Sequence, residues 1–515
     1  MLLLFLLQML LISNAFIHST NTFYSRCNVS LSKTSIKKTL SSLYTSSASC
    51  TDPESSSSLP SFYDRLNRPK SVAAPMVAQS DLAFRKLCRK HGTELTYTQM
   101  IHSKNFCISK TFQDTHLDVY NCNDVGKNSV INLQPSQSDA IQINQNDELI
   151  QHHSLSNYEE NGPVIVQLAG HDPPTMVNAA KIICETTQEG IAGIDVNLGC
   201  PQTIARKGNY GAFLMHQDFD LVVEILGELR SALPSHIGIS AKIRLPMPLI
   251  GKSVQSQEEQ LQQQVERLIV ESGINLLTIH GRTLEENKTK VRNCNWEMIQ
   301  KASEVTKQYN IPLIANGGIE HPSDISKCLQ QTQAQAVMSS EALLENPGIF
   351  ALDAKDESEM SAREIFDRQI QFSMQYLDLA LLNPPLPGSL GKECGSFNVV
   401  RAHLFKFLYR YLEQCPDLRS RLGDKSKDMR RIIHAKHLVH ELKERHANIS
   451  EDELKNKYKD SPSWYRRHRN SISLSHTRGA KESMENLTIE EKKKRMLERI
   501  KQLKAQKEQR RLQNI

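Results

Sequence analysis

Apolar residues along the chain gather into eight short runs typical of buried β-strands. Most neighbouring runs are separated by segments with apolar positions at helical spacing and a charged opposite face, such as MVNAAKIICETTQEG. The runs are SVAAPM, LTYTQM, PVIVQL, GIDVNL, IGISAKIRL, INLLTIH, IPLIAN and AQAVMSS. Eight strand–helix units in about 270 residues predict an α/β fold, a (β/α)8 TIM barrel, over residues 68–350. The alternative, a doubly wound open sheet, would carry a G-x-G-x-x-G turn after an early strand, and the sequence contains none.

The regular pattern is interrupted between the second and third runs. From about Cys107 to Glu160 the sequence is rich in Gln, Asn and Ser, as in INLQPSQSDAIQINQNDELIQHHSLSNYEE. Such a polar stretch predicts a long insertion, over residues 107–160, that lies outside the barrel core.

After Phe350 the pattern becomes entirely helical. Segments such as REIFDRQIQFSMQYLDLA and RRIIHAKHLVHELKERH predict a second domain, a small C-terminal helical bundle over residues 360–446. Residues 458–515 form a basic tail, in which Met496, Ile500 and Leu503 make a narrow apolar stripe. A solvated tail and an auxiliary RNA-binding arm are both compatible with this composition.

The first 60 residues have the composition of a targeting segment without a fold of its own. The apolar run MLLLFLLQMLLISNAF at the start of the sequence is shorter than a typical membrane-spanning helix. We therefore expect no membrane segment in the mature protein. Residues 17–51 are rich in Ser and Thr, contain four basic residues and lack acids. This order resembles a two-part plastid address, which predicts plastid localisation. Ordinary secretion is an alternative interpretation of the leader, and the cytoplasm and the mitochondrion are alternative compartments.

Charge and cysteine content add few constraints. A formal net charge of +6 permits a polyanionic partner without requiring one. The eleven cysteines show no C-x-x-C spacing, so the sequence predicts neither a metal site nor a disulfide framework. We expect reduced thiols and a monomer.

Polar residues recur at the carboxyl ends of the predicted strands, where a (β/α)8 barrel carries its chemistry. The ring consists of Gln167, Asn197, Cys200, Lys242, Arg244, His280, Arg282 and Asn316. Any one of these could be a satisfied polar residue, but together they predict an active site.

The strand ends also indicate the kind of ligand. Gly317 and Gly318 follow the seventh run, and MSSEAL is expected to open a helix after the eighth. Backbone N–H groups at such places bind phosphate. Lys242 and His280 could offset negative charge on a reduced flavin ring, with SVAAPM and Gln167 lining its opposite side. The ring of residues therefore predicts a phosphorylated ring cofactor, with FMN as the natural candidate.

The motifs AAPMV, YTQMI, VQLAG, DVNLGCPQ, KGNYGAFLM, AKIRL, TIHGRT, IANGGI and VMSSEALLENPGIF resemble the dihydrouridine synthase family. These flavoenzymes reduce uridine to dihydrouridine in tRNA. The resemblance covers Ser71 to about Phe350 apart from the insertion, and RAHLFKFL resembles the family's RNA-binding domain. GCPQTIARKGNYGAFL is similar to the eukaryotic branch that modifies positions 16 and 17 of the tRNA D-loop.

The resemblance implies a chemistry for Cys200. The family transfers a hydride from flavin N5 to C6 of uracil, and Cys200 matches its proton donor to C5. A free cysteine is most often a small buried hydrophobe. An ordinary thiol, with a pKa of about 8.5, is mostly protonated at neutral pH and can act as an acid. Nucleophilic catalysis is the competing interpretation, and it would need a paired base.

The resemblance also implies the binding residues. Those matching cofactor contacts are Pro75, Met76, Val77, Gln167, Lys242, His280, Asn316, Gly317, Gly318, Ser340 and Glu341. Many relatives carry Gly-Arg where this chain has Ser340 and Glu341, so a phosphate charge pair is missing. FMN and either NADPH or NADH are the implied cofactors. Asn197 and Arg244 match residues near the uracil.

Basic residues are expected to grip tRNA phosphates while the target base is extruded into the pocket. Arg206 and Lys207 are expected at the pocket rim. The helical domain offers Arg401, Lys406, Arg410, Arg430, Arg431 and Lys436. Two other functions stay open: an FMN barrel acting on a small free pyrimidine, and a non-catalytic RNA-binding protein. The helical domain argues against the first, and the intact ring with Cys200 argues against the second.

Overall fold

The computed structural model describes residues 61–119, 160, 162–247, 254–287, 291–386, 395–424, 432–458, 461 and 463–465. The expectations for the targeting segment 1–60 and for most of the basic tail 458–515 lie outside these residues. In the described part of the chain, the cysteines are free thiols. No helix there is both long and apolar enough to cross a membrane.

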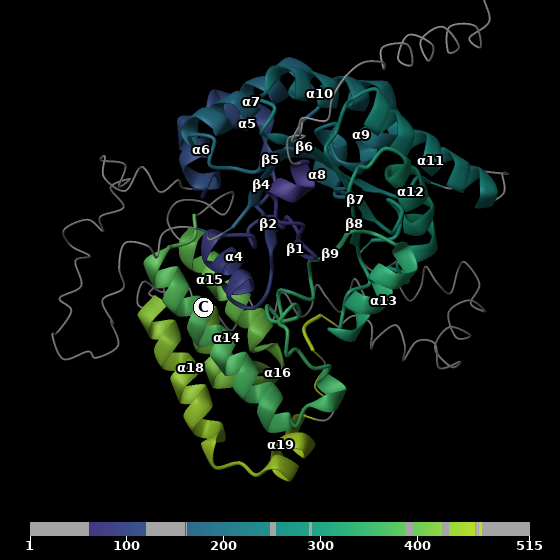
Figure 1. Ribbon diagram of the computed structural model, residues 1–515. Coiled ribbons are helices and arrows are strands. Elements are labelled where there is room, and N and C mark those ends of the chain that lie inside the picture. Colours follow the sequence, from purple (N-terminus) through teal and green to yellow (C-terminus); the bar gives the residue numbers. More distant parts are fainter. Residues whose placement is uncertain are drawn as a thin grey trace, which may run out of the picture. The chain divides into compact units, whose positions relative to one another are not determined.

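Parallel strands close into a barrel ringed by helices, as the sequence predicts (Figure 1). The chain enters at β1, and the last strand β9 pairs back with β1, for example Val72 with Met338. The strands are β1 (Ser71–Ala73), β2 (Leu95–Tyr97), β3 (Ile101–His102), β4 (Val164–Ala169), β5 (Gly193–Leu198), β6 (Gly238–Arg244), β7 (Leu276–His280), β8 (Leu313–Asn316) and β9 (Ala336–Ser339). All eight predicted runs therefore supply barrel strands.

The second run, LTYTQM, supplies β2, and a further short strand that was not predicted, β3, follows directly after it. Both β2 and β3 pair with β4, the first at its start and the second at its end. Between them the Thr98 hydroxyl accepts a hydrogen bond from the backbone N–H of Gln167 at 3.3 Å. A side chain thus takes the place of a ladder acceptor where the strand bends.

A short helix that the sequence analysis did not anticipate closes the amino-terminal end of the barrel. Helix α3 (Phe62–Arg65) begins with a Ser61–Asp64 capping box. Phe62 and Leu66 pack against the interior side chains of the strands. The fit is close, because a Cβ added to Gly238 would lie 2.1 Å from the Phe62 ring. This plug leaves the opposite end of the barrel as the open one.

Amphipathic helices cover the outside of the barrel, with apolar faces toward the strands. They are α4 (Leu82–Lys90), α5 (Ser103–Ile108), α6 (Lys110–His116), α7 (Pro173–Thr186), α9 (Ala212–Gln217), α10 (Phe219–Ala232), α11 (Val254–Val270), α12 (Trp296–Gln308) and α13 (Ser323–Thr332). The short α8 (Thr203–Lys207) follows the carboxyl end of β5 and packs in a separate small cluster with Tyr210. The two helices predicted from MVNAAKIICETTQEG and DFDLVVEILGELRSAL correspond to α7 and α10.

The packed barrel continues further into the polar interval than the predicted boundary at Cys107. Helix α6 continues to His116, and Leu117 and Val119 belong to the core. At the other end, Glu160 is buried against α4. Residues 120–159, the rest of the predicted insertion, lie outside the described residues.

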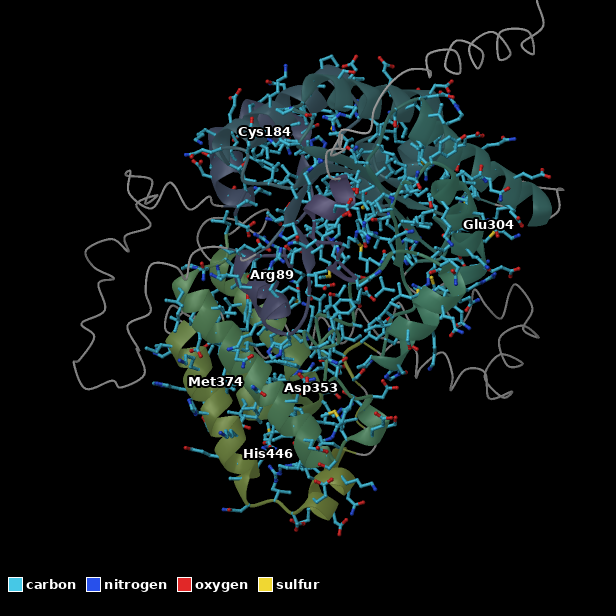
Figure 2. The ribbon with its side chains drawn as sticks, in the orientation of Figure 1. Arg89, Cys184, Glu304, Asp353, Met374 and His446 are labelled. Carbon is cyan, nitrogen blue, oxygen red and sulfur yellow. The ribbon has the colours of Figure 1, made fainter. Side chains whose placement is uncertain are left out.

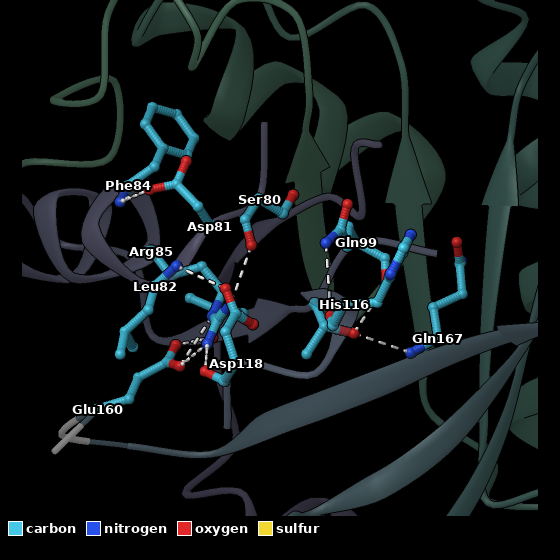
Figure 3. Close-up of polar contacts among 12 residues, drawn as sticks. Ser80, Asp81, Leu82, Phe84, Arg85, Gln99, His116, Asp118, Glu160 and Gln167 are labelled. Atoms are coloured by element: carbon cyan, nitrogen blue, oxygen red, sulfur yellow. Dashed lines mark hydrogen bonds and ion pairs between the residues drawn. The ribbon is translucent and has the colours of Figure 1, made fainter. Parts of the chain in front are cut away.

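A buried ion cluster holds both ends of this interval (Figure 3). The Arg85 guanidinium donates to Asp118 Oδ1 at 2.8 Å and to Glu160 Oε2 at 2.8 Å. Arg89 donates to the other oxygen of Glu160 at 3.2 Å. The Arg85 side chain is only 1% exposed, so the carboxylates compensate a guanidinium that is fully withdrawn from water.

Beyond the barrel the chain forms the predicted helices. They are the single-turn η4 (Glu357–Glu359), then α14 (Ala362–Leu382), α15 (Gly395–Phe407), α16 (Tyr409–Glu413), α17 (Pro416–Gly423), α18 (Ile432–Ala447) and α19 (Glu451–Tyr458). Their buried side chains continue the hydrophobic core of the barrel helices. Among them, His446, labelled in Figure 2, packs against Phe366 and hydrogen-bonds Tyr458.

The helical region is joined to the barrel through α4. The Asp81 carboxylate caps α4 by accepting from the backbone N–H of Phe84. It also accepts from His403 Nε2 of α15 at 2.8 Å and from the Tyr376 hydroxyl of α14 at 3.4 Å. All three side chains are buried, so one carboxylate links the loop after β1 to two helices of the second region.

Candidate active site

A cavity of about 590 Å³ lies at the open end of the barrel, where the strands carry their carboxyl ends. The predicted cofactor and catalytic residues all line it, as do Asn197 and Arg244. These residues are Pro75, Met76, Val77, Gln167, Asn197, Cys200, Lys242, Arg244, His280, Asn316, Gly317, Gly318, Ser340 and Glu341. Arg206 and Lys207 do not line the cavity but are exposed on α8.

The loop after β5 is fixed by two neighbours so that Cys200 lines the cavity. Asn197 Oδ1 accepts hydrogen bonds from the backbone N–H groups of Gly199 and Cys200, at 3.2 and 3.0 Å. Arg244 Nε donates to the Gly199 carbonyl at 2.8 Å. Burial raises the pKa of the Cys200 thiol, despite the opposing effects of Arg244 and Lys242. The thiol is therefore protonated at neutral pH, as a proton donor must be.

A chain of hydrogen bonds fixes the amide groups at the base of the cavity. Ser240 Oγ and Gln167 Nε2 each donate to the Asp195 carboxylate at 2.7 Å. Gln167 Oε1 in turn accepts from Asn197 Nδ2 at 2.8 Å. Because a carboxylate accepts only, it determines which way the Gln167 amide faces, and through Gln167 it orients Asn197.

The sequence analysis did not identify Asp195, the carboxylate of this hydrogen-bond network. The position of Asp195 could have been predicted, because residues alternate between the two faces of a strand. Ile194 and Val196 pack outward in the main core, so Asp195 faces the barrel interior on the same side as Asn197. A carboxylate in such a position marks a polar network inside an otherwise apolar barrel.

Lys242 and His280 bring a cation and a neutral ring to the cavity. Burial lowers the pKa of Lys242 to about 8, and its ammonium donates to Asn316 Oδ1 at 2.8 Å. Burial and the neighbouring cations hold the pKa of His280 well below its usual range. With Arg282 Nη1 donating to His280 Nε2 at 3.1 Å, the neutral imidazole carries its proton on Nδ1.

The turn after β8 presents backbone to the cavity. Gly317 and Gly318 have positive φ angles of 99° and 80°, which glycine adopts at no steric cost. The helix expected to open at MSSEAL is wrong, because residues 341–345 form consecutive turns. Pro347 explains the difference, since proline disfavours helical geometry in the residue before it and cannot itself continue a helix.

Four of the basic residues of the helical domain that are expected to contact phosphate have partners within the protein. Lys406 bonds the Gln79 side chain, and Lys436 donates to Asp378 at 2.7 Å. Arg410 donates to Glu357 at 3.3 Å, and Arg401 to Asn398 at 2.5 Å. Arg430 and Arg431 lie outside the described residues.

Comparison with known families identifies the family to which the chain belongs. The model of the family described as dihydrouridine synthase matches residues 71–139 and 138–380, more than half of the chain. The chain belongs to the dihydrouridine synthase family. The predicted resemblance is thereby confirmed, and the chain is an oxidoreductase.

Curated members of the family resemble the chain over most of its length. It is 30% identical over 365 residues to the tRNA-dihydrouridine(16/17) synthase of Saccharomyces cerevisiae, covering 70% of each chain. The synthase of the same name from Schizosaccharomyces pombe is 30% identical over 70% of this chain and 75% of its own. A protein from Rattus norvegicus, named as like this synthase, is 32% identical over 70% of this chain and 65% of its own.

Replacement of Asp195 by Asn is expected to change how stability depends on pH. Burial raises the pKa of Asp195 to about 6 in the folded state. Asp195 therefore stabilises the fold most at acidic pH and loses this contribution as pH rises through 6. From pH 4.5 to 7.5 the wild type should lose about 2 kcal/mol relative to Asp195→Asn, measured by urea unfolding. Parallel pH profiles for the two proteins would contradict this assignment.

Proposed function

We propose that the chain is a flavin-dependent tRNA-dihydrouridine synthase that reduces the C5=C6 bond of uridines at positions 16 and 17 of the tRNA D-loop. The observation that carries the proposal is the Cys200 thiol in the wall of a cavity ringed by the predicted cofactor residues. The names of the yeast relatives support the two positions and the use of NADPH or NADH as reductant.

The cavity residues fit FMN. At Gly317 an added Cβ would lie 2.8 Å from the His280 ring, so only glycine fits this turn against His280. Gly317 and Gly318 both line the cavity, and backbone N–H groups at such a turn can bind phosphate. The Lys242 ammonium bonds the neutral amide of Asn316, which leaves it suited to offset negative charge on a bound ring. The volume of about 590 Å³ lies within the usual range for cofactor sites.

Proton donation is the step assigned to this chain's own residues. When bound and reduced by NADPH or NADH, FMN supplies the hydride that reaches C6 of the uracil. Cys200 donates the proton to C5 from the other face of the ring, and its raised pKa keeps that proton in place until it is needed. Asn197 and Arg244 fix the Cys200 loop and face the uracil.

The substrate base reaches the cavity by extrusion from the tRNA, which costs a few kcal/mol of stacking and pairing. Arg206 and Lys207 are exposed on the helix that begins directly after the Cys200 loop. Phosphate contacts from these two side chains would offset part of that cost.

A visible spectrum of the full-length protein tests the proposal. The expected result is a yellow protein that NADPH bleaches in the absence of air, and that unmodified tRNA reoxidises while free uridine does not. Reoxidation by a small pyrimidine would instead favour a free-base oxidoreductase. A colourless protein that takes up no FMN would overturn the proposal.

A further inference from the structure

The carboxyl-terminal end of the described chain, Ser463–Tyr465, reaches the active-site cavity through one residue, Tyr465. Tyr465 lies in the cavity wall with Ser340 and Ala342, which follow β9. This segment, Ser463–Tyr465, lies beyond the residues matched by the family model, which end at residue 380. The cavity is therefore completed by a part of the chain that the family match does not cover.

A carboxylate beside the cavity fixes the position of this segment. Glu345 Oε1 accepts from the backbone N–H of Trp464, and Oε2 accepts from that of Tyr465, both at 3.1 Å. The Ser463 side chain also bonds Glu345. Glu345 belongs to the turns 341–345 that continue directly from Ser340 and Glu341. Hydrogen bonds from two backbone donors to one carboxylate are charge-assisted and specify the orientation of the segment.

A second contact connects the segment to the helical region. The Lys406 ammonium lies 5.3 Å from the centre of the Trp464 ring, within the range of a cation–π interaction. Lys406 also bonds the side chain of Gln79, two residues after Val77 in the cavity wall. Two independent contacts thus hold Ser463–Tyr465 against loops that line the cavity.

The position of Tyr465 bears on phosphate binding. Tyr465 and Ala342 also line a small neighbouring cavity with Glu320 and His321, two and three residues after Gly318. Tyr465 is therefore close to both loops that would hold the FMN phosphate. One of these loops carries Glu341, where the family resemblance predicts an arginine. A tyrosine supplies a hydroxyl donor and an aromatic face to a site that lacks this cation.

We propose that Tyr465, positioned by Glu345, is a binding residue of the cofactor site and contacts FMN at its phosphate end. The inference rests on the proposed FMN cofactor and extends it to a residue of the carboxyl-terminal segment. Glu345 acts through Tyr465 and is a positioning residue.

The test measures FMN binding rather than turnover. Full-length protein stripped of flavin is titrated with FMN, and quenching of flavin fluorescence gives the Kd. We expect Tyr465→Ala and Glu345→Ala each to raise the Kd about tenfold, the effect of losing one hydrogen bond to a charged group. The double variant should bind no more weakly than either single variant, because both changes remove the same contact. Tyr309→Ala, at a partly exposed tyrosine that follows α12 and does not line the cavity, is the matched control and should leave the Kd unchanged.

The possible results distinguish a failure of this inference from a failure of the proposed function. Wild-type protein that takes up no FMN overturns the proposed function. Wild-type protein that binds FMN, with Tyr465→Ala binding equally well, overturns the inference alone, and so does full additivity in the double variant. If the alanine variant does not fold, Tyr465→Phe keeps the ring, and a wild-type Kd for a folded Tyr465→Phe overturns the hydroxyl contact.

Discussion

Cys200→Ala is expected to lower the rate of dihydrouridine formation in tRNA by 10²- to 10⁴-fold, the usual contribution of a general acid. The thiol lines the cavity, and the hydrogen bonds that Asn197 and Arg244 make to this loop go to backbone groups that alanine keeps. FMN binding and the melting temperature should therefore remain close to wild type. Dihydrouridine is measured by mass spectrometry of tRNA that starts without the modification.

The matched control is Cys107→Ala, at a partly buried thiol on α5 that does not line the cavity. It should leave the rate near wild type. Because the raised pKa keeps Cys200 protonated through neutral pH, loss of the Cys200 proton should lower the rate only in the alkaline range. Dihydrouridine formation by Cys200→Ala at the wild-type rate would exclude Cys200 as the proton donor.

Arg85→Met is expected to destabilise the protein by about 3–5 kcal/mol, the cost of breaking a buried ion pair by removing one partner. Asp118 and Glu160 would keep their burial and lose the guanidinium that each accepts from. Burial already raises the pKa of Asp118, although Arg85 opposes this shift. Without Arg85 the carboxyl should titrate still higher, so the loss in unfolding free energy should be smaller at acidic pH. Urea unfolding at two pH values measures both effects.

The control is Arg68→Met, which removes an arginine from an ion pair with Asp64. The Arg68 side chain is 72% exposed. Exposed pairs contribute between zero and about 1 kcal/mol, so this control should change stability far less. Equal destabilisation by the two substitutions would show that the buried cluster has no special role.

The barrel could be predicted from sequence because its signals are local. Each strand appears in the sequence as a run that is continuously apolar or that alternates apolar and polar residues, and polar residues mark its end. The same pattern therefore predicts the carboxyl ends of the strands and the cavity residues found there, such as Lys242 and His280. Helix α3 escaped prediction because four residues are too few to show a helical period.

The remaining differences depend on pairings between distant residues. Glu160 bonds Arg85 across 75 positions, and no local pattern distinguishes it from the polar residues before it. The same limit applies to Lys406 and Lys436. The sequence shows that both are cationic, but it does not show which side chains they bond. Tyr465 reaches the cavity through Glu345, 120 positions away.

We expect the Asp81 junction to couple the cavity and the helical region thermodynamically. Asp81 and Gln79 belong to the loop that begins with the cavity residues Pro75–Val77, and their side chains bond His403 and Lys406 of α15. A bound cofactor that stabilises this loop should therefore also stabilise the contacts of the loop with α15. Linkage is reciprocal: a tRNA that tightens the helical region against the loop must strengthen cofactor binding by the same factor by which the cofactor strengthens tRNA binding.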